Sequence, residues 1–467
     1  MALNKVLKVN SSSELLSFIL NVTPELKSDI DLPVQGESIA KYGQLIMSNQ
    51  RYKNAFLNTI NLIGLTVINR NYWENPWEVF ANRGTLNFGQ TVREMLVDIA
   101  DVYDYQEFKD NATHFLENVV PNIYNYLHEI NFQKFYKTTT SDAEMAMAFQ
   151  TENGLFDLVE KISTSLYEGF KYDKYILDKY QLCRRILSGT VSAYKIENYD
   201  NLTPRERVSK MKAVSNKMAF RSPNYNPAGA RKATLFNNQI LIMNTDFEAD
   251  MSTDVLATSF FRDDAEMKTR SALIDGFGNH DEKRLAILIK DYVPFTKTEL
   301  QALSEIPAVL IEDTFFQDYY YALNTEAEGN GTTKRTDFYN PETLKHTMWL
   351  HAWLVLSTSP YANSVVFTKD TPEVTSVKVN PQESSISAGL DLQLSATVET
   401  TGFANKAVTW SVVSATGEVT PVTVDLTGKV HIPADFNTGE AEAPQITIKA
   451  TSVYNPEVSG EATITVL

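Results

Sequence analysis

Apolar side chains recur at helical spacing over one long stretch of the chain. Between residues 151 and 188 they return every three or four positions, at Leu155, Leu158, Val159, Ile162 and Leu166 and then at Ile176, Tyr180, Cys183 and Leu187. A period near 3.6 residues is typical of a helix with one apolar face. The pattern therefore predicts a long amphipathic helix over 151–188, either continuous or interrupted.

Shorter patterns predict more helices and strands before residue 371. We expect a helix over 91–100 and another over 341–358, where Asn340 provides a cap and Pro341 begins the first turn. Continuous apolar runs are typical of strands covered on both faces. Such runs occur at 240–243, 285–289 and 308–311. This part of the chain is therefore expected to be α+β.

The pattern changes at about residue 371. Beyond it apolar and polar residues alternate, most clearly at 392–398, 408–412 and 446–450, and glycines separate the alternating runs at short intervals. A period of two residues predicts half-buried strands, and the glycines predict the turns between them. We expect residues 371–467 to form a small all-β sandwich. Its predicted core residues are Leu394, Val408, Trp410 and Ile448.

Charge is distributed unevenly along the 467 residues, whose net charge is −16. Residues 372–467 hold four lysines and eleven acids, and they contribute −7 of that charge. A strongly acidic chain repels phosphates unless basic residues cluster locally. One such cluster exists between Pro204 and Lys232, with a net charge of +7 and Glu206 as its single acid. Its basic residues are Arg205, Arg207, Lys210, Lys212, Lys217, Arg221, Arg231 and Lys232.

The basic cluster has three possible roles that the sequence leaves open. It could contact the phosphates of a nucleic acid, it could contact an acidic surface of another subunit, or it could be a solvated helix face.

No motif in the sequence nominates an active site or a metal site. The single cysteine, Cys183, lies in an apolar helical pattern and is expected to be buried and inert. His346 and His351 are five residues apart, so they would diverge on a helix instead of sharing a metal ion. The acids of 246–254 lack the glycine and the closing glutamate of a calcium loop. We therefore expect no enzyme activity, no cofactor and no metal.

The first residues show neither a secretion signal nor an apolar stretch long enough to span a bilayer. The chain is therefore expected to act in the cytoplasm without contact with a membrane.

Two resemblances refine these expectations. The run from Val374 to Pro381, followed by LQLSATV, VTWSV, LTGKV, ITIKATS and GEATITV, resembles a bacterial immunoglobulin-like group 2 domain. Three earlier segments, 69–106, 240–261 followed by 272–277, and 340–367, resemble the major capsid proteins of tailed phages, in particular those of small podophages of the Picovirinae type. In that family an immunoglobulin-like group 2 domain directly follows the capsid core.

The capsid resemblance implies the Hong Kong 97 capsid fold over residues 1–370. That fold has an N-terminal arm, an extended loop, a peripheral domain with a long spine helix, and an axial domain. The extended loop would lie near 81–106 and the spine helix near 151–188, with the immunoglobulin-like domain at 371–467. Many copies would form the hexamers and pentamers of an icosahedral phage head, assembled in the bacterial host cytoplasm and then part of the virion.

The resemblance also implies partners and contact residues. The partners would be a portal protein, packaged double-stranded DNA and a scaffolding protein, which we expect to be separate because no long charged segment precedes the core. Residues 84–100 contain no lysine, so we expect a shell without covalent cross-links. The candidate contact residues of the extended loop are Trp73, Trp77, Phe88, Arg93 and Glu94.

Two other classes of protein compete with the capsid. One is a cell-surface or virion adhesin in which the sandwich binds glycans. The other is a glycan hydrolase, although no acid pair is nominated for it.

Overall fold

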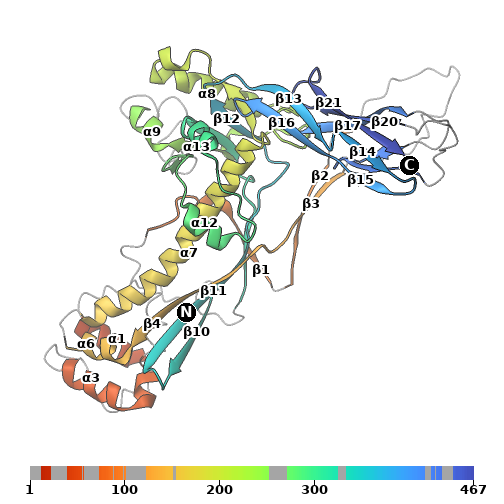
Figure 1. Ribbon diagram of the computed structural model, residues 1–467. Helices are drawn as coiled ribbons and strands as arrows, with labels where there is room; N and C mark the ends of the chain where they lie inside the picture. The colour runs from red at the N-terminus through yellow and green to blue at the C-terminus, as the bar shows by residue number, and fades with distance from the viewer. Residues whose placement is uncertain are drawn as a thin grey trace, which may run out of the picture. The chain divides into compact units, whose positions relative to one another are not determined.

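The computed structural model describes residues 12–22, 39–54, 56, 73–87, 89–97, 99–100, 123–150, 154–251, 271–323, 333–415, 422–425, 427–433 and 445–466 (Figure 1). The chain divides into two compact units. Unit 1 comprises Met1–Arg93, Leu127–Asp178 and Gln317–Ser357. Unit 2 comprises Glu94–Tyr126, Lys179–Phe316 and Thr358–Leu467.

The long helix predicted near 151–188 is confirmed as α7, which spans Gly154–Leu187 and contains 34 residues. Asp157 lies in its first turn, and Arg184 and Arg185 lie in its last turn. Both placements oppose the charge of the helix dipole and so stabilise the ends.

Unit 1 contains a five-stranded sheet built around β11 (Lys345–Val355). β11 pairs antiparallel with β4 (Phe132–Ser141), β10 (Thr333–Asn340) and β9 (Asp318–Tyr321). β1 (Asn82–Leu86) joins β9 in parallel. Figure 1 shows β4 beside the first half of α7, and Tyr136 of β4 donates to Asp173 of α7 at 2.7 Å.

The helix predicted over 341–358 is wrong, because most of this segment is strand β11. Its buried residues alternate along the chain, from His346 through Met348, Leu350 and Ala352 to Leu354. That spacing suits a sheet with one covered face. Leu350 and Leu354 also fit a helical period, which explains the error.

Four short helices complete the described part of unit 1. They are α1 (Ser12–Val22), α3 (Ile39–Ser48), α5 (Glu78–Ala81) and α6 (Asp142–Ala148). A capping box between Ser141 and Glu144 starts α6 directly after β4.

The helix predicted over 91–100 is also wrong. Val92–Val97 forms strand β2, which pairs with β3 (Ile123–His128) in a two-stranded ribbon. Residues of β2 alternate between half-buried and exposed positions, as in a strand.

Unit 2 contains a second sheet with the order β5-β12-β8-β6-β7. Its strands are β5 (Ser192–Lys195), β12 (Ser364–Thr368), β8 (Ala308–Glu312), β6 (Gln239–Asn244) and β7 (Ser271–Ile274). Every residue of β6, β8 and β12 is buried, which confirms the strands predicted at 240–243 and 308–311. The helices of this part are η3 (Tyr199–Asn201), α8 (Pro204–Met218), η4 (Phe236–Asn238), α9 (Thr245–Met251), α12 (Glu282–Leu288) and α13 (Lys297–Ser304).

The strand predicted at 285–289 is wrong, since α12 occupies most of this run. The Asp281 side chain accepts a hydrogen bond from the Arg284 backbone and caps the helix. Only Leu285 of α12 is buried, and Ile287 is 77% exposed. The run is therefore a surface turn of helix rather than a core strand.

Residues from Glu373 onward form the β-rich part predicted from the alternation. The pair β13 (Glu373–Asn380) and β16 (Ser395–Thr401) packs with the four-stranded sheet β14 (Glu383–Ile386), β21 (Ser459–Val466), β20 (Gln445–Ser452) and β17 (Val408–Ala415). A third sheet holds β15 (Asp391–Gln393), β19 (Lys429–His431) and β18 (Thr423–Val424). Leu394 and Ile448 are fully buried in the core, whereas Val408 and Trp410 pack at its margin and are only partly buried.

Candidate assembly and DNA-facing surfaces

Helix α8 carries five of the eight residues of the basic cluster, and the other three follow the helix. Thr203 and Glu206 form a capping box at its start, and Pro204 occupies the first turn. One face of the helix packs into the core through Val208, Met211, Val214 and Met218. Because these apolar residues fix the helix, the basic side chains between them point toward solvent.

Six of the eight predicted basic residues are exposed or half-buried, so their charged groups can reach a partner. Arg205, Lys210, Lys217, Arg221 and Arg231 are exposed, and Lys212 is half-buried. The other two serve the fold. Arg207 lies 4.3 Å from the ring centroid of Tyr199, and Lys232 Nζ lies 2.6 Å from Glu312 Oε1.

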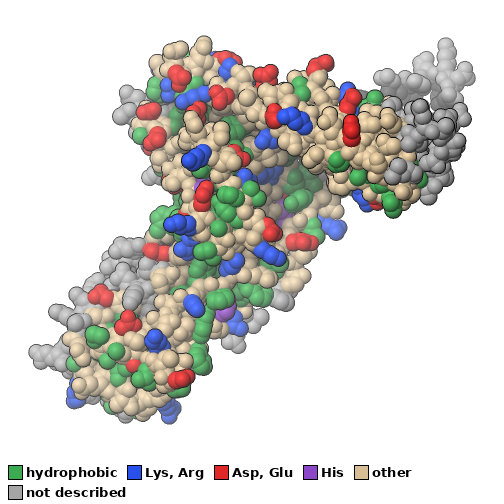
Figure 2. Space-filling view, in the orientation of Figure 1, with side chains coloured by type: hydrophobic (Ala, Val, Ile, Leu, Met, Phe, Trp, Pro, Cys, Tyr) green, Lys and Arg blue, Asp and Glu red, His purple; other side chains and the backbone are tan. Residues whose placement is uncertain are grey.

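The surface around the basic cluster carries side chains of both charges. On the face seen in Figure 2, acidic and basic side chains are interspersed over the helices of this region. Two large apolar side chains also lie among the cations, since Phe220 is 74% exposed and Leu235 is 64% exposed. The Thr234 backbone donates to Met218 O at 2.8 Å and so brings the two segments together. An apolar and cationic mixture of this kind suits a protein partner as well as phosphates.

The two tryptophans predicted at the extended loop differ in burial. Trp73 is 41% exposed and packs edge-on against Tyr175, with 5.5 Å between ring centroids. Trp77 is fully buried against the same Tyr175, so we assign it to the core of unit 1 rather than to a contact between subunits. Phe88 lies outside the described residues.

The remaining two predicted loop residues lie on β2. Arg93 is exposed. Glu94 Oε1 accepts a hydrogen bond of 2.7 Å from the Ser359 hydroxyl, so it has a partner within its own subunit.

The ribbon of β2 and β3 carries many exposed apolar side chains. Met95 is 65% exposed, Val97 is 58% exposed and Ile123 is 57% exposed. A lone two-stranded ribbon is marginally stable in water. Exposed apolar side chains on such a ribbon indicate that another surface covers it.

One face of the unit 1 sheet is also apolar and open. Phe135 of β4 is 59% exposed and Phe338 of β10 is 57% exposed. Between these strands β11 turns Trp349 and Trp353 to the same face, opposite Lys137 and Gln133 of β4. This face was not predicted, because 341–358 was expected to be a helix. Its signal was the alternation of aromatic with smaller residues in β11.

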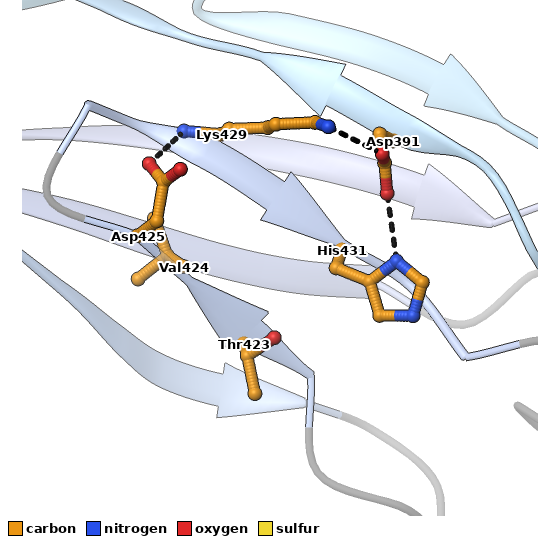
Figure 3. A pocket seen from close by; sticks show the side chains of 6 residues that line it. All are labelled: Asp391, Thr423, Val424, Asp425, Lys429 and His431. Carbon is orange, nitrogen blue, oxygen red and sulfur yellow. Dashed lines mark hydrogen bonds and ion pairs between the residues drawn. The ribbon is translucent and has the colours of Figure 1, made fainter.

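The sandwich has a shallow hollow of about 300 Å³, lined by Asp391, Thr423, Val424, Asp425, Lys429 and His431 (Figure 3). Asp391 accepts from Lys429 Nζ at 2.7 Å and from His431 Nδ1 at 2.7 Å. These hydrogen bonds lower the pKa of Asp391. Asp425 accepts from the Thr427 hydroxyl and from the Lys429 backbone, which lower its pKa. The two carboxylates of the hollow thus have hydrogen-bond partners.

The cysteine and the histidines, which could carry out chemistry or bind a metal, do not form a reactive site within the described ranges. Cys183 is fully buried, as expected, and burial raises the pKa of its thiol to about 12. His346 points into unit 1 and lies 3.0 Å from Asp337, whereas His351 lies on the opposite face of β11. Among these residues no group of three metal-ligating side chains comes together, and no helix has the length and hydropathy to cross a membrane.

Broad apolar faces on a ribbon and on a sheet, together with a basic helix, are typical of a protein that contacts other macromolecules over large areas. The chain belongs to the family described as Phi29-like phage major capsid protein, whose match covers residues 18–368. It is therefore a structural protein of the phage head, located in the virion capsid, and not an enzyme.

Several characterised proteins are similar to this chain. The major capsid protein of Bacillus phage PZA is 27% identical over 475 residues, covering 98% of this chain and 95% of that protein. The major capsid protein of Bacillus phage GA-1 is 25% identical over 405 residues, covering 84% of this chain and 78% of that protein. Among solved structures, the capsid of Staphylococcus phage Andhra matches with a TM-score of 0.44 and 16% identity, covering 66% of this chain and 87% of that chain.

Proposed function

We propose that this major capsid protein adopts the Hong Kong 97 type of capsid fold and closes into an icosahedral shell around double-stranded DNA. In this assignment unit 1 with α7 is the peripheral domain with its spine helix. The second sheet with α8 and α9 is the axial domain, and the ribbon of β2 and β3 is part of the extended loop. Residues from Glu373 onward are an immunoglobulin-like group 2 domain. Support comes from the family membership and from the order of these elements along the chain.

The observation that carries the proposal is a pair of open apolar surfaces. The ribbon exposes Met95 and Val97, and the unit 1 sheet exposes Phe135 and Phe338. A surface that a neighbouring copy covers in the same way on every subunit generates closed rings by heterologous contacts. The hexamers and pentamers of a shell are such rings.

Assembly of the full chain provides the test. Produced in bacteria with its neighbouring reading frames, the wild type is expected to form uniform closed shells in negative-stain micrographs. Phe135→Ser should remain folded but reduce the yield of shells severely, because it removes apolar contact area from the open face. Val413→Ser is the matched control, since Val413 is 54% exposed on a strand of the sandwich. Equal shell yields from the two variants would contradict a role for the open face.

We further propose that the basic cluster of α8 faces the packaged DNA. Its available cations are Arg205, Lys210, Lys212, Lys217, Arg221 and Arg231. Removing one cation that neutralises a phosphate should lower the slope of log affinity against log salt by about 0.9. For Lys210→Gln with Lys217→Gln we expect a slope smaller by roughly two, measured as binding of unassembled subunits to duplex DNA.

The sandwich supplies the control for the DNA experiment. Lys378→Gln with Lys429→Gln removes the same charge from side chains that are 68% and 50% exposed. If both double variants bind DNA with the wild-type slope, the cluster instead contacts a protein. The exposed side chain of Phe220 supports that alternative.

The remaining partners follow from the same proposal. A separate scaffolding protein directs assembly, a portal protein occupies one vertex, and the shell holds together without covalent bonds between subunits. In denaturing gels of mature particles this protein should then run as a single band at the mass of the monomer, 52.6 kDa. The acidic sandwich faces outward, so an antibody against it should label intact particles.

A further inference from the structure

A buried group of charges lies where α7, β9 and the start of β1 meet in unit 1. Lys174 of α7 is 2% exposed, and the side chains of Asp178 and Asp318 are both 0% exposed. The Lys174 ammonium lies 3.0 Å from Asp318 Oδ2 and 3.4 Å from Asp178 Oδ2. It also lies 3.1 Å from Glu78 Oε2 of α5.

The charges of this group do not balance if every carboxyl is ionised. Three carboxylates would face one ammonium, and two of them have no access to water. An uncompensated buried charge is strongly destabilising. Glu78 is 37% exposed and accepts from the Tyr320 hydroxyl at 2.7 Å, so its charge is solvated and hydrogen-bonded. The imbalance therefore falls on Asp178 and Asp318.

The two aspartates also lack part of their hydrogen bonding. Oδ1 of Asp178 and Oδ1 of Asp318 are buried without a hydrogen-bond partner. Asp178 and Asp318 both place Oδ2 within 3.4 Å of the same Lys174 ammonium, so the two carboxyls are neighbours. One proton shared by the two carboxyls would provide a hydrogen bond between them, and it would make the buried trio of Lys174, Asp178 and Asp318 electrically neutral.

We propose that Asp178 and Asp318 share one proton. With this proton in place, the group of Lys174, Asp178, Asp318 and Glu78, called the clamp below, holds the start of β1 to α7 and β9. The clamp weakens when the proton leaves. Three elements meet at the clamp. Glu78 lies in α5, which runs directly into β1, and Asp318 is the residue of β9 paired with Asn82 of β1. Because β1 is an edge strand that pairs, within the described part of the chain, only with β9, loss of the clamp frees the strand that leads toward the ribbon.

The surroundings agree with a shared proton. Burial, then the neighbouring carboxyl, raises the pKa of Asp178 well above its ordinary value of 3.8, and burial raises that of Asp318. Burial lowers the pKa of Lys174, but Asp178, Asp318, Tyr320 and Glu78 together outweigh burial and raise this pKa well above its ordinary value, so the ammonium stays charged. The other groups facing the cluster are Glu78 of α5 and Tyr320 of β9. Asp173, next to Lys174, bonds Tyr136 instead.

A raised carboxyl pKa in the folded state sets the sign of the pH dependence. Above the ordinary value of 3.8 the unfolded chain releases this proton while the folded chain keeps it. The stabilisation is complete at low pH and is lost as pH rises through the folded-state pKa. Within that window one retained proton makes the unfolding equilibrium constant rise about tenfold per pH unit.

The test compares the unassembled full-length wild type with Asp178→Asn, whose amide supplies a hydrogen bond at every pH. Denaturant unfolding between pH 5 and pH 8 is expected to give a slope of log unfolding constant against pH that is smaller by about one proton in the variant. Asp173→Asn is the matched control and should keep the wild-type slope. Asp318→Asn should repeat the effect, and it replaces Asp178→Asn if that variant fails to fold.

A local measurement tests the clamp itself. Amide hydrogen exchange of peptides covering β1, corrected for the intrinsic pH dependence, should accelerate with pH in the wild type but not in Asp178→Asn. Peptides of β8 in unit 2 should not respond. Equal pH slopes in the wild type and both asparagine variants would overturn the shared proton. A changed slope without a change in β1 protection would overturn the clamp. Neither result depends on shell assembly, so both stand apart from the proposed function.

Discussion

Lys174 in unit 1 and Lys429 in the sandwich both bind aspartates at hydrogen-bonding distance, yet the two groups differ in their exposure to water. Lys174 and its two aspartates are at most 2% exposed, whereas Lys429 is 50% exposed and Asp391 is 39% exposed. Burial raises the pKa of Asp178 and Asp318, whereas hydrogen bonds from Lys429 and His431 lower the pKa of Asp391. The same chemical pair thus responds to pH with opposite sign, and burial decides which sign.

The two groups also differ in what they contribute to stability. A buried charge that loses its partner is strongly destabilising, whereas exposed ion pairs contribute little. The sandwich must therefore depend on packing more than on charge. The buried residues of its hydrophobic core are all aliphatic, so close contacts where turns approach this core matter.

The largest expected effect comes from breaking the buried group. Lys174→Met fills a similar volume but leaves Asp178 and Asp318 without their cation. We expect a loss of about 3–5 kcal/mol in the free energy of unfolding, measured by denaturant titration of the unassembled chain. Lys429→Met removes the corresponding cation of the exposed group and should change the unfolding of the sandwich only slightly. Similar losses from both variants would contradict the contrast.

The buried group could not be recognised from the sequence. Lys174 and Asp178 are four residues apart, within KYDKYILDKY, and such a pair usually indicates a solvated helix face. What buries it is Asp318 on a strand that lies 140 residues further along the chain, together with Tyr320. Only tertiary contacts reveal that the polar side of α7 is covered here.

Other parts of the molecule were predictable to different degrees. The helix at 151–188 and the sandwich strands have long regular patterns of apolar residues, so the period of the pattern was enough to predict them. The open face of Phe135 and Phe338 was hidden because 341–358 satisfies both a helical and a strand period, and pairing with β4 and β10 decides between them. The basic cluster was found from charge alone, but the engagement of Arg207 by Tyr199 and of Lys232 by Glu312 depends on the fold.

An intermediate effect is expected from a packing change in the sandwich. A Cβ on Gly428 would lie 2.7 Å from both Leu394 O and Trp410 Cζ2, and the residue has φ +83°. Gly428→Ala should therefore destabilise the sandwich by about 1–3 kcal/mol, measured by thermal unfolding. Gly229→Ala is the control, because φ is +65° there but nothing lies within 4 Å of the added methyl. If both substitutions have equal effects, backbone strain and not packing sets the loss.

The smallest expected effect is the pH response of the exposed group, which runs opposite to that of the clamp. A lowered carboxyl pKa contributes stability that is present above the ordinary value of 3.8 and is lost as pH falls through the folded-state pKa of Asp391. Corrected amide exchange in β15 and β19 should therefore accelerate slightly when pH falls from 5 to 3, while β1 stays protected. Asp391→Asn should reduce this response, since it removes one of the two carboxyls of the hollow with a lowered pKa and leaves Asp425. Faster exchange in β15 at pH 7 than at pH 5 would mean that the exposed network follows the buried one and that solvent access does not set the sign.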